Sequence, residues 1–177
     1  LEKYDRANAQ TQGVTTPLTF REDVQNITER LPVKQAKLVL GFKNKISGSD
    51  ADTYKIMVMC DLFGGGTYSL LFSNVREKMS LCYYCAARAN RRKGVLTVDS
   101  GVEFENIEKT KNAILEQLDT LKQGNIDEQA LLSSKKALTQ SLESTADSQT
   151  VTERFYADRL FDENVLSPTQ LIEKINS

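Results

Sequence analysis

The chain has 177 residues, of which 40% are hydrophobic and 27% charged, and its formal net charge is −1. This is the composition of a globular domain large enough for one substantial core, and the near-neutral charge gives no reason to expect binding to nucleic acid or to an anionic membrane. Nowhere does an apolar run approach the roughly 20 residues that a membrane span needs.

Residues 1–32 mix polar residues with glycine and proline, and we predict a linker that includes a docking helix over 19–31. The domain proper is predicted to occupy residues 33–177. It opens with a strand whose apolar side chains alternate with other residues, namely Ala36, Leu38, Leu40 and Phe42. A polar turn at 47–50 is expected to cap the helix that follows.

The middle of the chain is predicted to form two helices and a β-hairpin. Residues 54–63 are apolar nearly all round, which predicts a deeply buried helix that ends at the glycine triplet 64–66. Residues 81–85 and 95–98 have the character of two strands joined by a short polar turn. Between the glycines and this hairpin, a second helix is predicted from apolar side chains that recur on one face: Tyr68, Leu71, Phe72, Val75 and Met79.

The C-terminal third is predicted to be helical in four segments. Apolar residues recur at helical spacing over 107–121, Asp127 can cap a second helix, residues 151–160 suggest a third, and Ser167-Pro168 opens a last one. The order of strand, two helices, hairpin and further helices predicts an α+β class. We expect a layered sandwich in which a largely antiparallel sheet packs with helices.

Cys82-Tyr83-Tyr84-Cys85 is formally a CxxC motif. In a regular strand, residues three apart point to opposite faces, so the two thiols are not expected to share a metal. Zinc would need two further ligands, and only Cys60 remains because the chain contains no histidine. We therefore predict no metal site and three buried, reduced thiols, a state that suits a cytoplasmic protein.

Three other polar groupings are predicted to have structural roles. The glycine triplet precedes a helix but lacks the Lys-Ser/Thr of a phosphate-binding loop, so a tight turn is predicted. Glu103 and Glu105 are predicted to be charges at a helix N-terminus. The basic cluster is predicted to be a solvated hairpin tip, with contact to an acidic peptide or a partner domain as the alternative: Arg88, Arg91, Arg92 and Lys93.

The stretch LFGGGTYSLLFSNVREKMSLCYY, residues 62–84, resembles the second-domain signature of the insulinase, pitrilysin and mitochondrial processing peptidase family, the inverzincins. The similarity continues through KGVLTVDSGVEFENIEK and AILEQLDTLKQGNIDEQALLSSKKAL, and more weakly in VKQAKLVLGF, so that it covers most of 33–145. It implies a LuxS/processing-peptidase-like metalloenzyme fold of the bacterial short-chain type. Such domains close with another helix and strand, before which this chain is expected to be clipped.

The resemblance also singles out Arg76 and Tyr83. From spacing alone, Arg76 is predicted to be an arginine at a helix end, and Tyr83 a tyrosine in a half-buried strand. In the family, an arginine and a tyrosine seven positions apart contact the main chain and carbonyl of the substrate, and these two match that separation. The arginine would hold a carbonyl or carboxylate oxygen, and the tyrosine would donate to the developing oxyanion. Tyr84 is the alternative tyrosine.

Catalysis in the inverzincins needs an HxxEH motif, which a chain without histidine cannot supply. The resemblance therefore implies a substrate-binding, non-zinc domain of a zinc-dependent metallopeptidase, with no catalytic residue of its own and no activity alone. Zinc would be held by another domain, in the same chain or in a dimer partner, and the substrate would be a peptide. The alternative is a non-catalytic structural or peptide-binding subunit of the same family. Neither a nucleic acid nor a membrane is implied as a partner, and the expected location is cytoplasmic.

Overall fold

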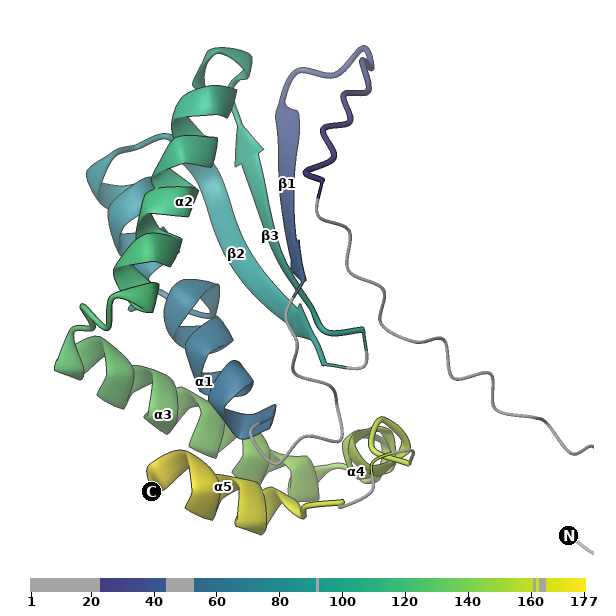
Figure 1. Ribbon diagram of the computed structural model, residues 1–177. Coiled ribbons are helices and arrows are strands. Elements are labelled where there is room, and N and C mark those ends of the chain that lie inside the picture. Colours follow the sequence, from purple (N-terminus) through teal and green to yellow (C-terminus); the bar gives the residue numbers. More distant parts are fainter. Residues whose placement is uncertain (1–22, 44–52, 92, 161, 163–164) are drawn as a thin grey trace, which may run out of the picture.

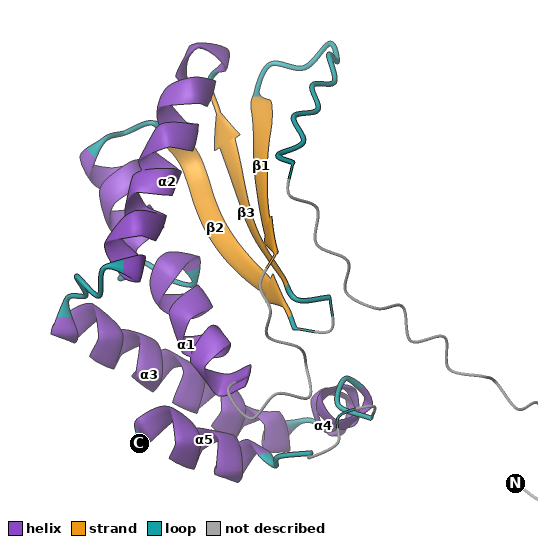
Figure 2. Ribbon diagram, viewed as in Figure 1, coloured by secondary structure: helices purple, strands orange, loops and turns teal. Residues whose placement is uncertain are grey.

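The computed structural model describes residues 23–43, 53–91, 93–160, 162 and 165–177 (Figure 1). In this part of the chain, three strands form one antiparallel sheet in the order β1-β3-β2. The helices that pack against the sheet lie on one of its faces (Figure 2). The predicted α+β class is confirmed. The strands are β1 (Ala36–Lys43), β2 (Cys82–Asn90) and β3 (Val95–Val102).

Strands β2 and β3 form the predicted hairpin, with Asn90 paired to Val95 next to the turn. Gly94 has φ +56° there, a left-handed conformation that glycine adopts without a steric penalty. Strand β1 pairs along the other edge of β3, from Ala36 opposite Val102 to Lys43 opposite Val95. The central position of β3 explains why four of its residues, including Val98 and Val102, are buried to 4% exposure or less.

The helical segments follow the predicted order. The Asp127 carboxylate accepts from the backbone N–H of Gln129 at 3.4 Å and of Ala130 at 3.2 Å, as expected of an N-cap. Ser167 and Gln170 form a reciprocal capping box ahead of the last helix. The segments are α1 (Thr53–Gly64), η1 (Leu71–Lys78), η2 (Phe104–Asn106), α2 (Ile107–Lys122), α3 (Glu128–Glu143), η3 (Ser144–Asp147), α4 (Gln149–Ala157) and α5 (Pro168–Asn176).

The main core lies between the sheet and the elements α1, η1 and α2. The helical side contributes Phe63, Leu71, Val75 and Ile114, all at 0% exposure, and strand β3 contributes Val98, also at 0%. A second, smaller core joins α3, α4 and α5 through a cluster of buried side chains: Leu142, Phe155, Leu171 and Ile175. Apolar burial of this kind is the dominant stabilising term in folding, so the first core fixes the position of η1 on the sheet.

Two expectations differ from the structure. Residues 23–31, the described part of the docking helix predicted over 19–31, contain no helix, and Ile27 is 91% exposed. Without a packed face, a short amphipathic segment is a marginal helix. The helix over 54–63 is buried only in its last turns, since Ile56 to Met59 keep partial exposure. The predicted turn at 47–50 lies outside the described residues.

The helix after the glycine triplet is also different, because η1 is a π-helix. The N–H of Met79 bonds to the carbonyl of Asn74, five residues earlier, at 3.0 Å. This wider turn shifts the faces that a period of 3.6 predicts, and Met79 is 44% exposed instead of buried. Leu71 and Val75 remain in the core as expected.

Gly64, the last residue of α1, lies against strand β2. A Cβ atom placed there would be 2.5 Å from the backbone nitrogen of Ala87 and 2.8 Å from its Cβ. Both distances are shorter than van der Waals contact, and neither atom belongs to a flexible side chain. Glycine is therefore required where the helix meets the sheet.

Replacing Gly64 by alanine is expected to lower the free energy of unfolding by about 1–3 kcal/mol, because overpacking forces α1 away from β2. The measurement is urea unfolding of the purified chain. Gly41→Ala is the matched control, since a Cβ at Gly41 in β1 would meet nothing within 4 Å. Equal stability of the two variants would contradict the close approach of α1 to β2.

Candidate functional site

Arg76 and Tyr83 border one surface groove of about 400 Å³. The groove lies where the end of η1 passes into β2, beside the chain that leaves β3. Ser80, at the junction, adopts φ +51°, so the chain turns sharply between the two elements. The lining residues are Arg76, Glu77, Ser80, Leu81, Cys82, Tyr83, Glu103 and Asn106.

The Arg76 side chain is held in place by three contacts. Its Nε donates to the backbone carbonyl of Tyr83 at 2.9 Å, and its Nη1 lies 3.3 Å from a carboxylate oxygen of Glu77. The guanidinium carbon is 4.6 Å from the centre of the Phe72 ring, a cation–π contact. The side chain is still 39% exposed, so a fixed positive charge faces the groove.

Tyr83 projects into solvent at the groove, with 56% of the residue exposed. Its hydroxyl donates to a carboxylate oxygen of Glu103. This hydrogen bond, together with the negative charge of Glu103, raises the pKa of Tyr83. The hydroxyl therefore keeps its proton at neutral pH and can act as a hydrogen-bond donor.

Glu103, which the sequence predicts to be a helix-end charge, also lines the groove. It does precede the short helix η2, which agrees with that interpretation, but its carboxylate turns to Tyr83. The register of the predicted hairpin could have indicated this contact, because it sets the start of β2 beside the end of β3. Glu105 is exposed and does not line the groove.

A β-bulge explains why the two neighbouring tyrosines behave differently. Cys82 is paired with Val102 and Tyr84 with Gly101, so Tyr83 is an extra residue in β2. Tyr84 packs over Gly101, where an added Cβ would lie 2.7 Å from its ring. Its hydroxyl is buried and, among the described residues, has no hydrogen-bond partner. Tyr84, the alternative tyrosine, does not line the groove.

Because of the same bulge, the expectation that the two CxxC thiols point to opposite faces of the strand is wrong. Cys82 is opposite Val102 and Cys85 is opposite Ser100, two residues that lie on the same face of β3. The two thiols therefore share a face of the sheet. Cys60 and Cys85 are buried as predicted, but Cys82 is only half-buried and lines the groove.

The basic cluster is solvated only in part. The Nη1 of Arg91 lies 2.6 Å from Asp162, and its Nη2 donates to the carbonyl of Asp158 at 2.6 Å. Because both charged side chains of this ion pair are at least 80% buried, the prediction of a solvated tip is wrong for Arg91. Arg88 is 76% exposed, as predicted, and Arg92 lies outside the described residues.

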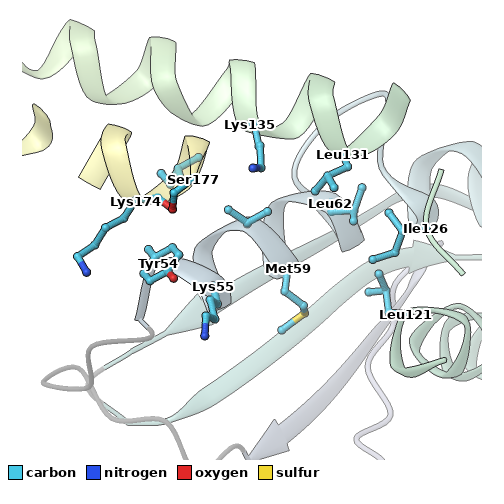
Figure 3. A pocket seen from close by; sticks show the side chains of 12 residues that line it. Tyr54, Lys55, Met59, Leu62, Leu121, Ile126, Leu131, Lys135, Lys174 and Ser177 are labelled. Carbon is cyan, nitrogen blue, oxygen red and sulfur yellow. The ribbon is translucent and has the colours of Figure 1, made fainter. Parts of the chain in front are cut away.

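A second cavity, of about 290 Å³, lies between α1, α3, α5 and the end of α2 (Figure 3). Its walls are apolar side chains such as Met59, Leu62 and Leu131, and three lysines stand around it, namely Lys55, Lys135 and Lys174. None of its lining residues has a carboxylate or thiol side chain. The groove at Arg76 is the better candidate because it combines fixed charge with a hydroxyl donor.

Over the described residues, no three histidine, cysteine or acidic side chains are grouped so as to hold a metal ion. The donor set of the described residues therefore does not fit a zinc ion, which takes four ligands in a structural site and three in a catalytic one. Among the helices that the structure describes, none is long and apolar enough to cross a membrane.

Comparison with known proteins identifies relatives of the chain. It is 36% identical over 149 residues to the probable inactive metalloprotease YmfF of Bacillus subtilis, covering 83% of this chain and 35% of that protein. It is 33% identical over 143 residues to the uncharacterized zinc protease YmxG of the same organism, covering 77% and 35%. The chain thus spans about a third of the length of these relatives.

The structural comparison agrees. A conserved protein from Enterococcus faecalis V583, 28% identical, superposes with a TM-score of 0.83 over 90% of this chain and 38% of that one. The model of the peptidase M16 inactive domain matches residues 3–138. The family predicted from the stretch 62–84 is thereby confirmed, and the chain belongs to the peptidase M16 inactive domain family.

Proposed function

We propose that this domain is the substrate-binding, non-zinc part of a zinc-dependent metallopeptidase that hydrolyses peptides in the cytoplasm. The observation that supports it is the convergence of Arg76 and Tyr83 on one groove, from two different elements. The π-helix brings the arginine to the edge of the sheet, and the bulge turns the tyrosine outward. Irregularities of both kinds recur at functional sites.

In this proposal the two side chains have different tasks. The guanidinium of Arg76 holds a main-chain carbonyl of an extended peptide by charge-assisted hydrogen bonds. The hydroxyl of Tyr83 leaves Glu103 and donates to the oxygen that becomes negative during hydrolysis. Zinc belongs to another domain, in the same chain or in a dimer partner, where a metal of this kind polarises the carbonyl and activates water.

The second candidate function is a non-catalytic, peptide-binding or structural subunit. It is favoured by one relative, whose name describes it as a probable inactive metalloprotease. In that case Arg76 and Tyr83 would bind a peptide without taking part in its cleavage. The two candidates differ in the zinc content of the whole protein and not in this domain.

The experiment is a zinc determination and a quenched-peptide cleavage assay on the full-length protein and its Tyr83→Phe variant. We expect bound zinc, cleavage by the parent, and turnover reduced by about 10²-fold in the variant at unchanged zinc content, the usual cost of losing one oxyanion donor. Tyr156→Phe is the control, because Tyr156 is an exposed tyrosine on α4, outside the groove.

Each alternative outcome has a definite meaning. Parental turnover in the Tyr83→Phe variant would remove the role proposed for this hydroxyl. A parent protein with neither zinc nor cleavage, but with measurable peptide binding, would favour the non-catalytic subunit.

A further inference from the structure

The apolar cavity between α1, α3 and α5 is separate from the groove at Arg76, since the two share no lining residue (Figure 3). Its volume of about 290 Å³ lies at the lower end of the range of small-molecule sites, about 300–1,000 Å³. Two of its wall residues, Leu62 of α1 and Ile175 of α5, are each only 2% exposed. Because the packing of the domain fixes these residues, the cavity is formed before any ligand arrives.

The charge around this cavity has one sign. Among the described residues, every charged side chain that lines it is a lysine, namely Lys55 from α1, Lys135 from α3 and Lys174 from α5. The Nζ atoms of Lys55 and Lys174 lie 5.9 Å and 5.4 Å from the centre of the same Tyr54 ring. These two positive charges repel each other, so an anion bound at this end of the cavity would relieve the repulsion.

Lys135 adds a third positive charge, and it is half-buried. It belongs to none of the ion pairs formed within the part of the chain that the structure describes. Figure 3 shows its side chain reaching from α3 toward α1. Because partial burial lowers the effective dielectric constant, an anion attracts this ammonium group more strongly than it attracts one in open water.

The opposite end of the cavity is apolar. Figure 3 shows Tyr54 and Lys174 at one end and Leu121, Ile126 and Leu131 at the other. A ligand that matches both ends has a hydrocarbon tail and an anionic head. The apolar end would bury the tail, and the lysines would hold the head by charge-assisted hydrogen bonds.

We propose that this cavity binds the anion of an unbranched, medium-chain fatty acid. The tail lies against the leucines and Ile126, and the carboxylate lies beside the ammonium groups of Lys55, Lys135 and Lys174. Charge complementarity selects this occupant, because no lining residue has a carboxylate side chain that would repel it. The proposal does not depend on the proposed function of the groove.

The experiment is isothermal titration calorimetry of decanoate into the full-length protein. We expect saturable binding of one decanoate per chain. Hexanoate is expected to bind about fourfold more weakly for each methylene group that it lacks, because each buried methylene contributes to affinity by that factor. Decylammonium has the same tail with a positive head, and we expect no binding.

Two lysines of α3 provide a matched pair of variants. Lys135→Gln is expected to weaken decanoate binding about tenfold, the effect of losing one hydrogen bond to a charged group. Lys136→Gln is the control, because Lys136 is exposed on the same helix and does not line the cavity. It is expected to bind like the parent.

A third variant tests the cavity itself without changing its charge. Ile126→Trp places a larger side chain at the apolar end and is expected to abolish decanoate binding. Since Ile126 is 38% exposed, this change does not overfill the core, and an unchanged thermal unfolding midpoint would verify that the variant folds.

Three results would overturn the proposal. Absence of saturable decanoate binding to the full-length protein would show that the cavity is closed to it or covered by another part of the protein. Equal weakening by Lys135→Gln and Lys136→Gln would show attraction to general surface charge. Decylammonium binding as tight as that of decanoate would show that the lysines do not select the head group.

Discussion

Replacing Arg76 by alanine in the full-length protein is expected to weaken the binding of an extended peptide by about tenfold or more. A hydrogen bond from a charged group contributes about 1.5–3 kcal/mol, and each 1.4 kcal/mol is a factor of ten in affinity. The guanidinium is already fixed by Tyr83, Glu77 and Phe72, so little side-chain entropy is lost when a peptide binds. The measurement is fluorescence titration with a labelled peptide.

Two further variants separate charge from geometry. Arg76→Lys keeps the positive charge but loses the planar fork and the Nε bond to the Tyr83 carbonyl, so we expect affinity between that of the parent and that of Arg76→Ala. Arg154→Ala removes an exposed arginine of α4 outside the groove and is expected to bind like the parent. If Arg76→Ala also bound like the parent, Arg76 would be a structural residue of η1 and the proposed binding mode would be wrong.

Stability provides the check on that interpretation. The contacts of Arg76 lie at the surface, and exposed pairs such as Arg76–Glu77 are worth less than about 1 kcal/mol. If Arg76→Ala lost little free energy of unfolding but bound the peptide tenfold more weakly, the loss of affinity would come from a missing contact in the groove. A large loss of stability would instead indicate that Arg76 maintains the bulge through the Tyr83 carbonyl.

Local patterns predicted most elements because each has a strong local cause. The alternation at Ala36 to Phe42 became β1, Asp127 and Ser167 cap the helices they were expected to cap, and the short polar turn joins β2 to β3. These features depend on residues within a few positions of each other. The segment 23–31 lacks such support, because its apolar side chains are exposed in the described structure and provide no packed face for a helix.

The irregularities of the candidate site had no comparable local signal. A π-turn in η1 and one extra residue in β2 each change which way the following side chains point, and both are selected by packing against the rest of the domain. A regular strand would have sent Cys82 and Cys85 to opposite faces, and a regular helix would have buried Met79. Spacing together with a family resemblance selected Arg76 and Tyr83, and both side chains line the groove.

Contacts between segments that are distant in the sequence could not be predicted from local sequence patterns either. Tyr83 and Glu103 are 20 positions apart, and Arg91 and Asp162 are 71 apart. The sequence shows that a charged or polar side chain needs a partner, but only the folded chain shows which carboxylate lies near it. Asp61 is the clearest case, since it lies in a segment predicted from hydrophobicity alone and yet joins three parts of the domain.

Replacing Asp61 by alanine is expected to lower the free energy of unfolding by about 3 kcal/mol, the cost of leaving two hydroxyls without a partner. Its Oδ2 accepts from the Tyr68 hydroxyl at 2.6 Å and from the Ser134 hydroxyl at 2.6 Å. The carboxylate thereby ties α1 to the segment after the glycine triplet and to α3. Ser134 is fully buried, so water cannot replace the lost acceptor there.

Asp119, which forms an exposed ion pair within α2, is the matched acidic control. Asp119→Ala removes an exposed aspartate of α2 whose pair with Lys122 is 63–65% exposed, and a change within about 0.5 kcal/mol is expected. In a double-mutant cycle, Ser134→Ala should lose less stability in the Asp61→Ala background than alone, because its partner is already gone. Independent, additive losses would show that the two side chains do not interact, and the joint between α1 and α3 would then rest on apolar packing alone.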